Sequence, residues 1–245
     1  MQFGIRLHDA VQAPIEERLK IVKEQGFACA HVALSKVISE NSVAPSALTP
    51  GYAMYLRRLF DKNGLDCAVL GCYLNLANPD PAQLRQIQDK YMANIRFAET
   101  GAPNTAYQFE EACWNEESLQ TFIKNLRPVV KYAEQMGVLM AIEPVVRHIV
   151  CNPVRARRVL DEIDSPNLRI ILDPVNLLET YNYEKQDEIL DEAVELLGRD
   201  VAVLHERVIP YMKKEKPFMH ATLENTKPDN AVAALSYIRE LYQNS

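Results

Sequence analysis

The sequence alternates eight short apolar runs with longer amphipathic segments, and this alternation restricts the fold more than any other feature. Each run is short enough to be a buried strand, and none shows the strict polar–apolar alternation of a half-exposed strand. The runs lie at residues 2–6, 28–34, 67–72, 105–108, 138–143, 168–173, 201–205 and 218–224. We therefore expect eight parallel strands that are buried on both faces.

Segments with helical periodicity separate these runs, and several are followed by a glycine of the kind that ends helices. The segments are 15–25, 52–63, 81–99, 117–136, 152–163 and 184–197, and the glycines are Gly26, Gly64, Gly101 and Gly137. Eight strands that alternate with helices predict an α/β fold, a (β/α)₈ TIM barrel. A chain of 245 residues can form such a barrel as a single domain, which we place at residues 1–245.

An open, doubly wound sheet is the alternative fold. Such a sheet typically carries a glycine-rich phosphate loop after its first strand. This chain has Arg6-Leu7-His8-Asp9-Ala10 at that position, which disfavours the open sheet.

Charge and composition narrow the classes of partner. The formal net charge of −6 disfavours nucleic acid, because such binding depends on a basic surface that neutralises phosphates. No apolar stretch approaches the roughly 20 residues that span a bilayer, and the amino-terminal residues lack a signal-peptide layout. The five cysteines are scattered, with no CxxC spacing. We expect a cytoplasmic protein without nucleic-acid or membrane partners, and a homo-oligomer is compatible with the sequence.

The last four predicted strands each end in a residue that can bind a metal. These residues are Glu143, Asp173, His205 and Glu224. Active sites of such barrels lie at the carboxyl ends of the strands, where the four side chains would converge. Grouped carboxylates repel one another unless a cation neutralises them. The sequence therefore predicts one divalent metal ion on these four residues; Mn²⁺, Mg²⁺ or Co²⁺ is favoured, and Zn²⁺ is compatible although sulfur ligands are absent.

Each of the four residues has a simpler explanation when it is taken alone. Glu143 could be a solvent-facing strand end, and Asp173 could open a turn before Pro174. His205 could be a core histidine, and Glu224 could cap the last helix. Four such residues on successive strands are harder to explain separately, which favours the metal site.

Four motifs resemble one known family over nearly the whole chain. They are Gly71-Cys72-Tyr73-Leu74-Asn75-Leu76, Ala141-Ile142-Glu143-Pro144-Val145 with His148, Leu172-Asp173-Pro174-Val175-Asn176-Leu177, and Leu223-Glu224-Asn225. The sequence is similar to the xylose isomerase-like barrels, which include sugar phosphate isomerases and epimerases, inosose dehydratases and endonuclease-IV type nucleases. The resemblance implies metal ligands on strands five to eight. It also implies that Glu143 and Glu224 are the catalytic acid/base pair for proton transfer through a metal-stabilised enediolate.

Other polar residues near strand ends are expected to contact the substrate. In many relatives a histidine stands three residues after the strand-six Asp, where this chain has Asn176. Asn can hydrogen-bond a hydroxyl but cannot carry a proton at neutral pH, so proton transfer should rest on the two glutamates. The predicted substrate-binding residues are Arg6, His8, Tyr73, Asn75, Gln108, His148 and Asn176.

The interval between the last two strands is unusually short. Earlier strands begin about 30 residues apart, whereas the step from Val201 to Phe218 leaves only about 17. We expect a shortened loop after strand seven, with a helix over 207–214. By resemblance, about 20 to 30 residues that include a Lys-Asp pair are missing here. A lost loop, a trimmed chain and an omitted segment are the three explanations, and a real loss would weaken water exclusion from the pocket.

These features favour a divalent-metal-dependent isomerase or epimerase that acts on a sugar or sugar phosphate. A dehydratase of the inosose or dehydroshikimate type is the nearest alternative, because the same metal and base can expel a β-hydroxyl. A sugar-binding barrel that has lost catalysis is another. A nuclease is disfavoured by the acidic charge and by the presence of only five histidines.

Overall fold

Seven parallel strands form one curled sheet in the computed structural model, which describes residues 1–72, 74–78, 80–100, 114–205, 213 and 216–244. The sheet order is β3-β2-β1-β7-β6-β5-β4. The strands are β1 (Gln2–Arg6), β2 (Cys29–Val32), β3 (Asp66–Leu70), β4 (Met140–Ile142), β5 (Leu168–Leu172), β6 (Val201–His205) and β7 (His220–Leu223). The first and last strands pair directly, from Gln2 opposite His220 to Ile5 opposite Leu223. The predicted α/β class with parallel strands is confirmed.

The predicted fourth strand, 105–108, lies outside the described residues. The strands labelled β4 to β7 therefore correspond to the predicted fifth to eighth strands. The predicted helix 207–214 also falls largely outside the described residues. The structure of the shortened connection between β6 and β7 therefore stays a prediction.

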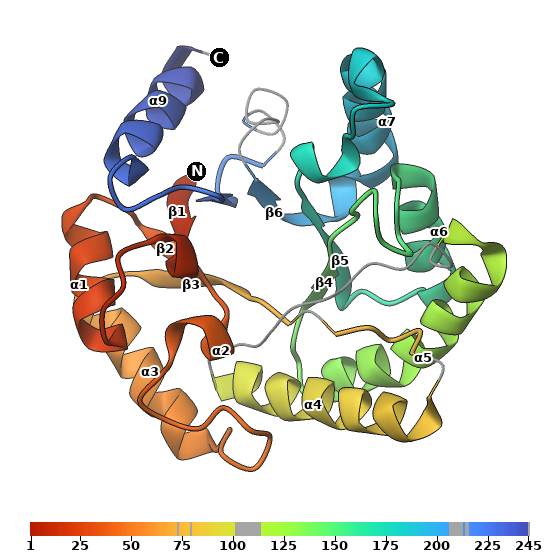
Figure 1. The fold of residues 1–245 in the computed structure, drawn as a ribbon, viewed down its shortest axis with the longest axis horizontal. Coiled ribbons are helices and arrows are strands. Elements are labelled where there is room, and N and C mark those ends of the chain that lie inside the picture. The colour runs from red at the N-terminus through yellow and green to blue at the C-terminus, as the bar shows by residue number, and fades with distance from the viewer. Residues whose placement is uncertain (73, 79, 101–113, 206–212, 214–215, 245) are drawn as a thin grey trace.

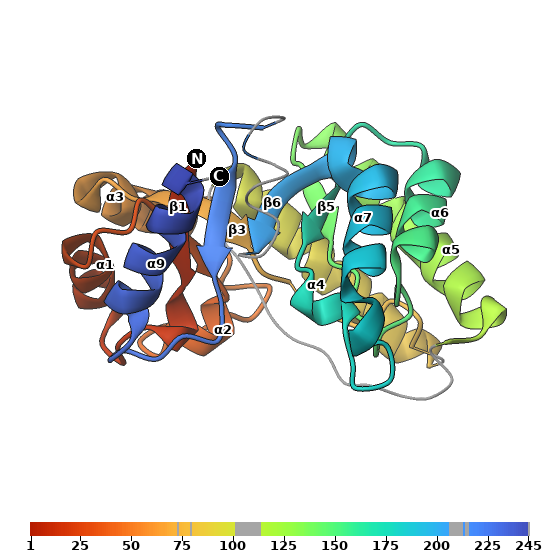
Figure 2. The same ribbon diagram turned by 90° about the horizontal axis from the view of Figure 1, so that it is seen from above.

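Helices surround the sheet on its outer side (Figure 1). Figure 2 shows the same arrangement from above. Among the described helices, none has the length and apolar character to cross a membrane. The helices are α1 (Ile15–Glu24), α2 (Leu34–Val37), α3 (Pro50–Asn63), α4 (Pro81–Thr100), α5 (Glu116–Gln135), α6 (Pro153–Ile163), α7 (Gln186–Leu197) and α9 (Ala231–Asn244).

Helix α3 illustrates how local sequence sets the helix limits. Thr49 caps its amino end by accepting a hydrogen bond from the backbone N–H of Tyr52 at 3.2 Å, and Pro50 occupies the first turn. Gly64 ends it in the left-handed conformation with φ of 62°. Positive φ at Gly26 and Gly137 confirms two further predicted stops, and Gly101 lies outside the described residues.

Of the seven described strands, β1 and β6 have the predicted limits, and the other five differ by one or two residues at one or both ends. Strand β7 begins at His220 rather than Phe218, and the Phe218 residue is 92% exposed. Strand β2 ends at Val32, and buried Leu34 instead begins the short helix α2. These two differences have one cause, because an apolar run alone does not distinguish a strand from a turn or a short buried helix.

A small apolar cluster fills the inside of the curled sheet. It consists of Val69 of β3, Ile171 of β5 and Val203 of β6, with three alanines packed against it: Ala68, Ala141 and Ala202. Strand β3 lies at one end of the sheet order, and β5 and β6 lie near the other. Their shared cluster shows that the sheet curls round on itself, as a barrel interior packed with side chains requires.

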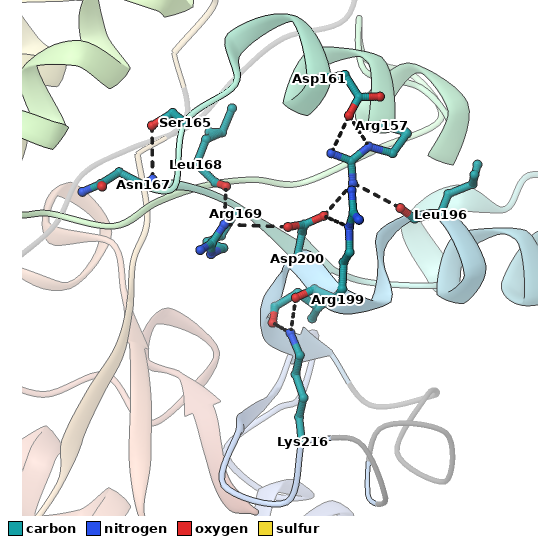
Figure 3. A network of polar contacts seen from close by, with 11 residues as sticks. Arg157, Asp161, Ser165, Asn167, Leu168, Arg169, Leu196, Arg199, Asp200 and Lys216 are labelled. Atoms are coloured by element: carbon teal, nitrogen blue, oxygen red, sulfur yellow. Dashed lines mark hydrogen bonds and ion pairs between the residues drawn. The ribbon is translucent and has the colours of Figure 1, made fainter.

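A polar network ties the amino-terminal end of β6 to its neighbours (Figure 3). Asp200 ends the short helix η5 (Gly198–Asp200), and its Oδ2 accepts a hydrogen bond from Arg157 Nη1 at 2.5 Å. Lys216 Nζ donates to the carbonyl oxygens of Arg199 and Val201, at 2.9 and 2.6 Å. Because this face lies opposite the carboxyl ends of the strands, the network serves stability.

We predict that Asp200→Asn lowers the free energy of unfolding by about 1–3 kcal/mol at pH 7. Burial raises the pKa of Asp200, but hydrogen bonds from Arg157 and Arg199 outweigh it, so the pKa is lowered. Its contribution is therefore present above pH ~4 and is lost as the pH falls through the lowered pKa. Urea unfolding at pH 7 and pH 3 measures this. The control, Asp61→Asn, removes a pair that is 60% or more exposed and should cost about 0.5 kcal/mol or less.

Candidate metal centre

Three acidic side chains meet at the carboxyl ends of the strands. Glu143 directly follows β4, Asp173 follows β5 and Glu224 follows β7. One carboxylate oxygen from each lies within 4.8 Å of the other two. Asp173 is buried, and the Glu224 side chain is only 8% exposed. The structure thus brings together three of the four residues that the sequence predicts as ligands, and their metal binding stays a prediction.

The fourth predicted ligand, His205, is the last residue of β6. Its backbone lies opposite Thr222 of β7, on a strand between β5 and β7. Its side chain lies outside the described residues, so its part in a metal site stays a prediction.

Glu143 and Asp173 are held by the short helix η3 (Val175–Leu177). Asn176 Nδ2 donates a hydrogen bond to Glu143 Oε1 at 2.7 Å, and the backbone N–H of Val175 donates to Asp173 Oδ1 at 3.0 Å. Asp173 therefore also opens the turn before η3. Asn176 lies close to the acidic cluster, where the sequence predicts a substrate-binding residue.

An arginine and a histidine lie against Glu224 on its opposite side. Arg6, at the end of β1, donates from Nη1 to Glu224 Oε2 at 2.6 Å. Nδ1 of His31, in β2, lies 3.2 Å from Glu224 Oε1, although the approach is not aligned as a hydrogen bond. The His31 side chain is 1% exposed. Sequence reasoning missed His31, and the available signal was a histidine one residue before the carboxyl end of an otherwise apolar strand.

Asp9 and Asn225 complete this side of the centre, and neither was predicted as a site residue. Asp9 Oδ2 accepts from Arg6 Nε and from the backbone N–H of Asn225, both at 2.7 Å. Arg6 Nη2 donates to Asn225 Oδ1 at 2.8 Å. Asn225 has φ of 56°, a left-handed conformation that Asn adopts more readily than most residues. All three donor nitrogens of Arg6 therefore contact protein acceptors.

A cavity of about 660 Å³ adjoins the acidic cluster, a size typical of small-molecule sites. Lys36 of α2 stands at its wall, and most of the remaining wall is apolar. Of the predicted site residues, those that line it are Arg6, Asn75, Glu143, His148, Asn176 and Glu224.

Of the predicted substrate-binding residues that the structure describes, His8 does not line that cavity. The ring of His8 packs edge-on against His31 with centroids 6.4 Å apart, and its Nε2 lies 3.5 Å from Lys36 Nζ. Tyr73 and Gln108 lie outside the described residues. Substrate contact by these three stays a prediction.

Two histidines at the site are predicted to make stability depend on pH. Burial lowers the pKa of His148 to about 4, and burial together with Arg6 and Lys36 lowers that of His8 to about 4. The unfolded chain binds protons near pH 6.5, so stability should fall as the pH drops from about 6.5 to 4. Replacing both histidines by Asn should reduce this fall, as measured by urea midpoints at pH 7, 6 and 5. Equal slopes in the variant and the natural protein would contradict the prediction.

Solved structures share this fold along nearly the whole chain. D-psicose 3-epimerase of Clostridium cellulolyticum H10, with D-tagatose, is 15% identical with a TM-score of 0.75, and the match covers 99% of both chains. A 3-keto-D-glucoside 4-epimerase from E. coli is 15% identical with a TM-score of 0.72, over 98% of this chain and 99% of that one. A D-tagatose 3-epimerase-like protein is 18% identical with a TM-score of 0.72, over 100% and 99%. At these identities the likeness shows the fold.

No curated protein sequence matches the chain. The model of one protein family, described as xylose isomerase-like TIM barrel, matches residues 19–213. That match spans well over half of the chain and confirms both the predicted barrel and the predicted resemblance. The protein therefore belongs to the xylose isomerase-like TIM barrel family.

Proposed function

We propose that the protein is a divalent-metal-dependent isomerase or epimerase that acts on a sugar or sugar phosphate. The observation that carries this proposal is the cluster of Glu143, Asp173 and Glu224, with oxygens within 4.8 Å, beside a cavity of about 660 Å³. Several proteins of the same fold are described as epimerases of ketoses. Their activities support the substrate class proposed for this chain.

The chemistry of the cluster fits a divalent cation. Three carboxylates carry three negative charges, and the Arg6 guanidinium beside Glu224 is itself shared with Asp9. Without further positive charge, three such groups would repel one another. Oxygen ligands suit Mn²⁺, Mg²⁺ or Co²⁺, and Zn²⁺ is also compatible. Glu143, Asp173 and Glu224 would hold the ion, with His205 as the predicted fourth ligand.

The bound ion would supply positive charge that stabilises the oxygens of the substrate as negative charge develops on them. The carboxylate of Glu143, oriented by Asn176, takes a proton from the carbon beside the carbonyl and leaves an enediolate. In an epimerase, Glu224 delivers a proton taken up from solvent to the opposite face of the same carbon, and Glu143 releases its proton to solvent. In an isomerase, one glutamate returns the proton to the neighbouring carbon. His148 and Asn75 line the cavity, and we expect them to contact sugar hydroxyls.

The test is exchange with solvent deuterium. The protein is loaded with Mn²⁺ and incubated in D₂O with D-psicose, D-tagatose, D-fructose, L-ribulose and their phosphates, and products are followed by NMR and mass spectrometry. We expect one deuterium at the carbon beside the carbonyl of at least one sugar. The carbon skeleton should stay intact, and the sugar should lose no water. Loss of one water would instead identify the dehydratase, and binding without exchange would favour the barrel that has lost catalysis. A sample treated with chelator is the control.

A further inference from the structure

The residues beside Glu224 form a closed ring of hydrogen bonds between β1 and β7. Arg6 Nη1 contacts Glu224, Arg6 Nη2 contacts Asn225, and Arg6 Nε contacts Asp9. Asp9 closes the ring through the backbone N–H of Asn225, the residue directly after Glu224. The side chains of Arg6, Asp9 and Glu224 are 16%, 13% and 8% exposed, so these three side chains are largely shielded from water. The two contacts made by Asn225 are exposed.

Asp9 fixes both parts of the structure that orient Glu224. Its Oδ2 orients the Arg6 guanidinium from one side, and the same oxygen holds the backbone of Asn225 in its left-handed conformation. A long Arg side chain held by one contact keeps several rotamers, whereas contacts at Nε and both Nη atoms leave one. Glu224 lies close to two other carboxylates on one side. On its other side, Arg6 is thus a fixed partner for its negative charge.

We infer that Asp9 is a positioning residue for Glu224 that acts through Arg6, an inference that rests on the proposed metal-dependent function. Asp9 contacts Arg6 and the Asn225 backbone, and its effect on the centre is the orientation of one ligand. Outer residues that orient metal ligands typically change metal affinity about 10- to 100-fold when they are replaced. A simple surface ion pair would have no such effect.

The test is Asp9→Asn, which keeps the size of the side chain and an oxygen that can accept from Asn225. It removes the negative charge that holds Arg6. We expect Mn²⁺ affinity, measured by titration with detection of free Mn²⁺ by electron paramagnetic resonance, to fall about 10-fold or more. We also expect a larger fold-change in kcat than in KM. The matched control is Asp61→Asn, which alters an exposed ion pair on a helix. It should leave the Mn²⁺ affinity and kcat unchanged.

Two further variants separate an effect through Arg6 from general destabilisation. In an Arg6→Gln background, adding Asp9→Asn should cause little further loss of Mn²⁺ affinity. An affinity within twofold of the natural protein for Asp9→Asn, or an equal added loss in the Arg6→Gln background, would overturn the inference.

The inference and the proposed function can fail separately. If the natural protein binds none of Mn²⁺, Mg²⁺, Co²⁺ and Zn²⁺, the proposed function fails, and the ring is then tested by urea unfolding in the presence of chelator. Asp9→Asn and Glu224→Gln should shift the midpoint by amounts that do not add in the double variant, because the two residues share Arg6. Additive shifts would overturn the positioning role of Asp9.

Discussion

Replacing Glu143 by Gln should lower turnover by about 10²- to 10⁴-fold while the fold stays intact. Gln has the same shape, and its oxygen can still accept the hydrogen bond from Asn176. A neutral amide, however, does not take a proton from carbon and is a weaker metal ligand than a carboxylate. The measurement is kcat with the best sugar from the deuterium-exchange screen, together with Mn²⁺ affinity and the thermal unfolding midpoint.

Glu224→Gln should give a loss of similar size for the same reason, and it also removes the charge that pairs with Arg6. The matched control is Glu188→Gln, which makes the same change on the exposed face of α7 and should leave kcat unchanged. Turnover equal to that of the natural protein in both site variants would contradict the assignment of the two glutamates as the acid/base pair.

Replacing Gly4 by Ala should lower stability by about 3 kcal/mol, because the added carbon has no space. A Cβ at this position would lie 2.5 Å from the carbonyl oxygen of Cys29 and 2.6 Å from its Sγ. The oxygen belongs to the backbone of β2, the strand that pairs with β1 at this point, so it cannot rotate away. For a chain of this size the expected fall in Tm is roughly 6–12 °C.

Gly51→Ala makes the identical substitution in helix α3, where the nearest atom, Thr49 Oγ1, is 4.0 Å from the added Cβ. Ala is the better helix former, so Tm should stay the same or rise. Differential scanning calorimetry of the two variants compares them directly. If Gly4→Ala melted at the same temperature as Gly51→Ala, the close approach of β1 and β2 would be contradicted.

The strand limits show what an apolar pattern can predict. Strands β1 and β6 have the predicted limits, because in each case a single apolar run gives way to a polar residue at its end. Phe218 was misplaced because an exposed aromatic residue next to a strand has the same appearance in sequence as a buried one. The short helix α2 was missed because its four residues are too few to show a helical period.

The site was predictable to the extent that it depends on strand ends. Glu143, Asp173 and Glu224 follow buried runs, so the position rule for barrels finds them without any knowledge of contacts. The ring around Glu224 was not predictable in this way. Arg6 and Glu224 are 218 positions apart and meet only because β1 pairs with β7 in one register. The approach of His31 to Glu224 likewise depends on the curl of the sheet.

The most direct test of the metal centre is a crystal structure of the protein with Mn²⁺ and a ketose, with anomalous scattering used to locate the metal. We predict one strong anomalous peak coordinated by Glu143, Asp173 and Glu224, with His205 as the fourth protein ligand and the carbonyl end of the sugar beside the two glutamates. A peak held by other residues, or an ordered sugar in a cavity whose carboxylates bind no metal at saturating Mn²⁺, would contradict this prediction.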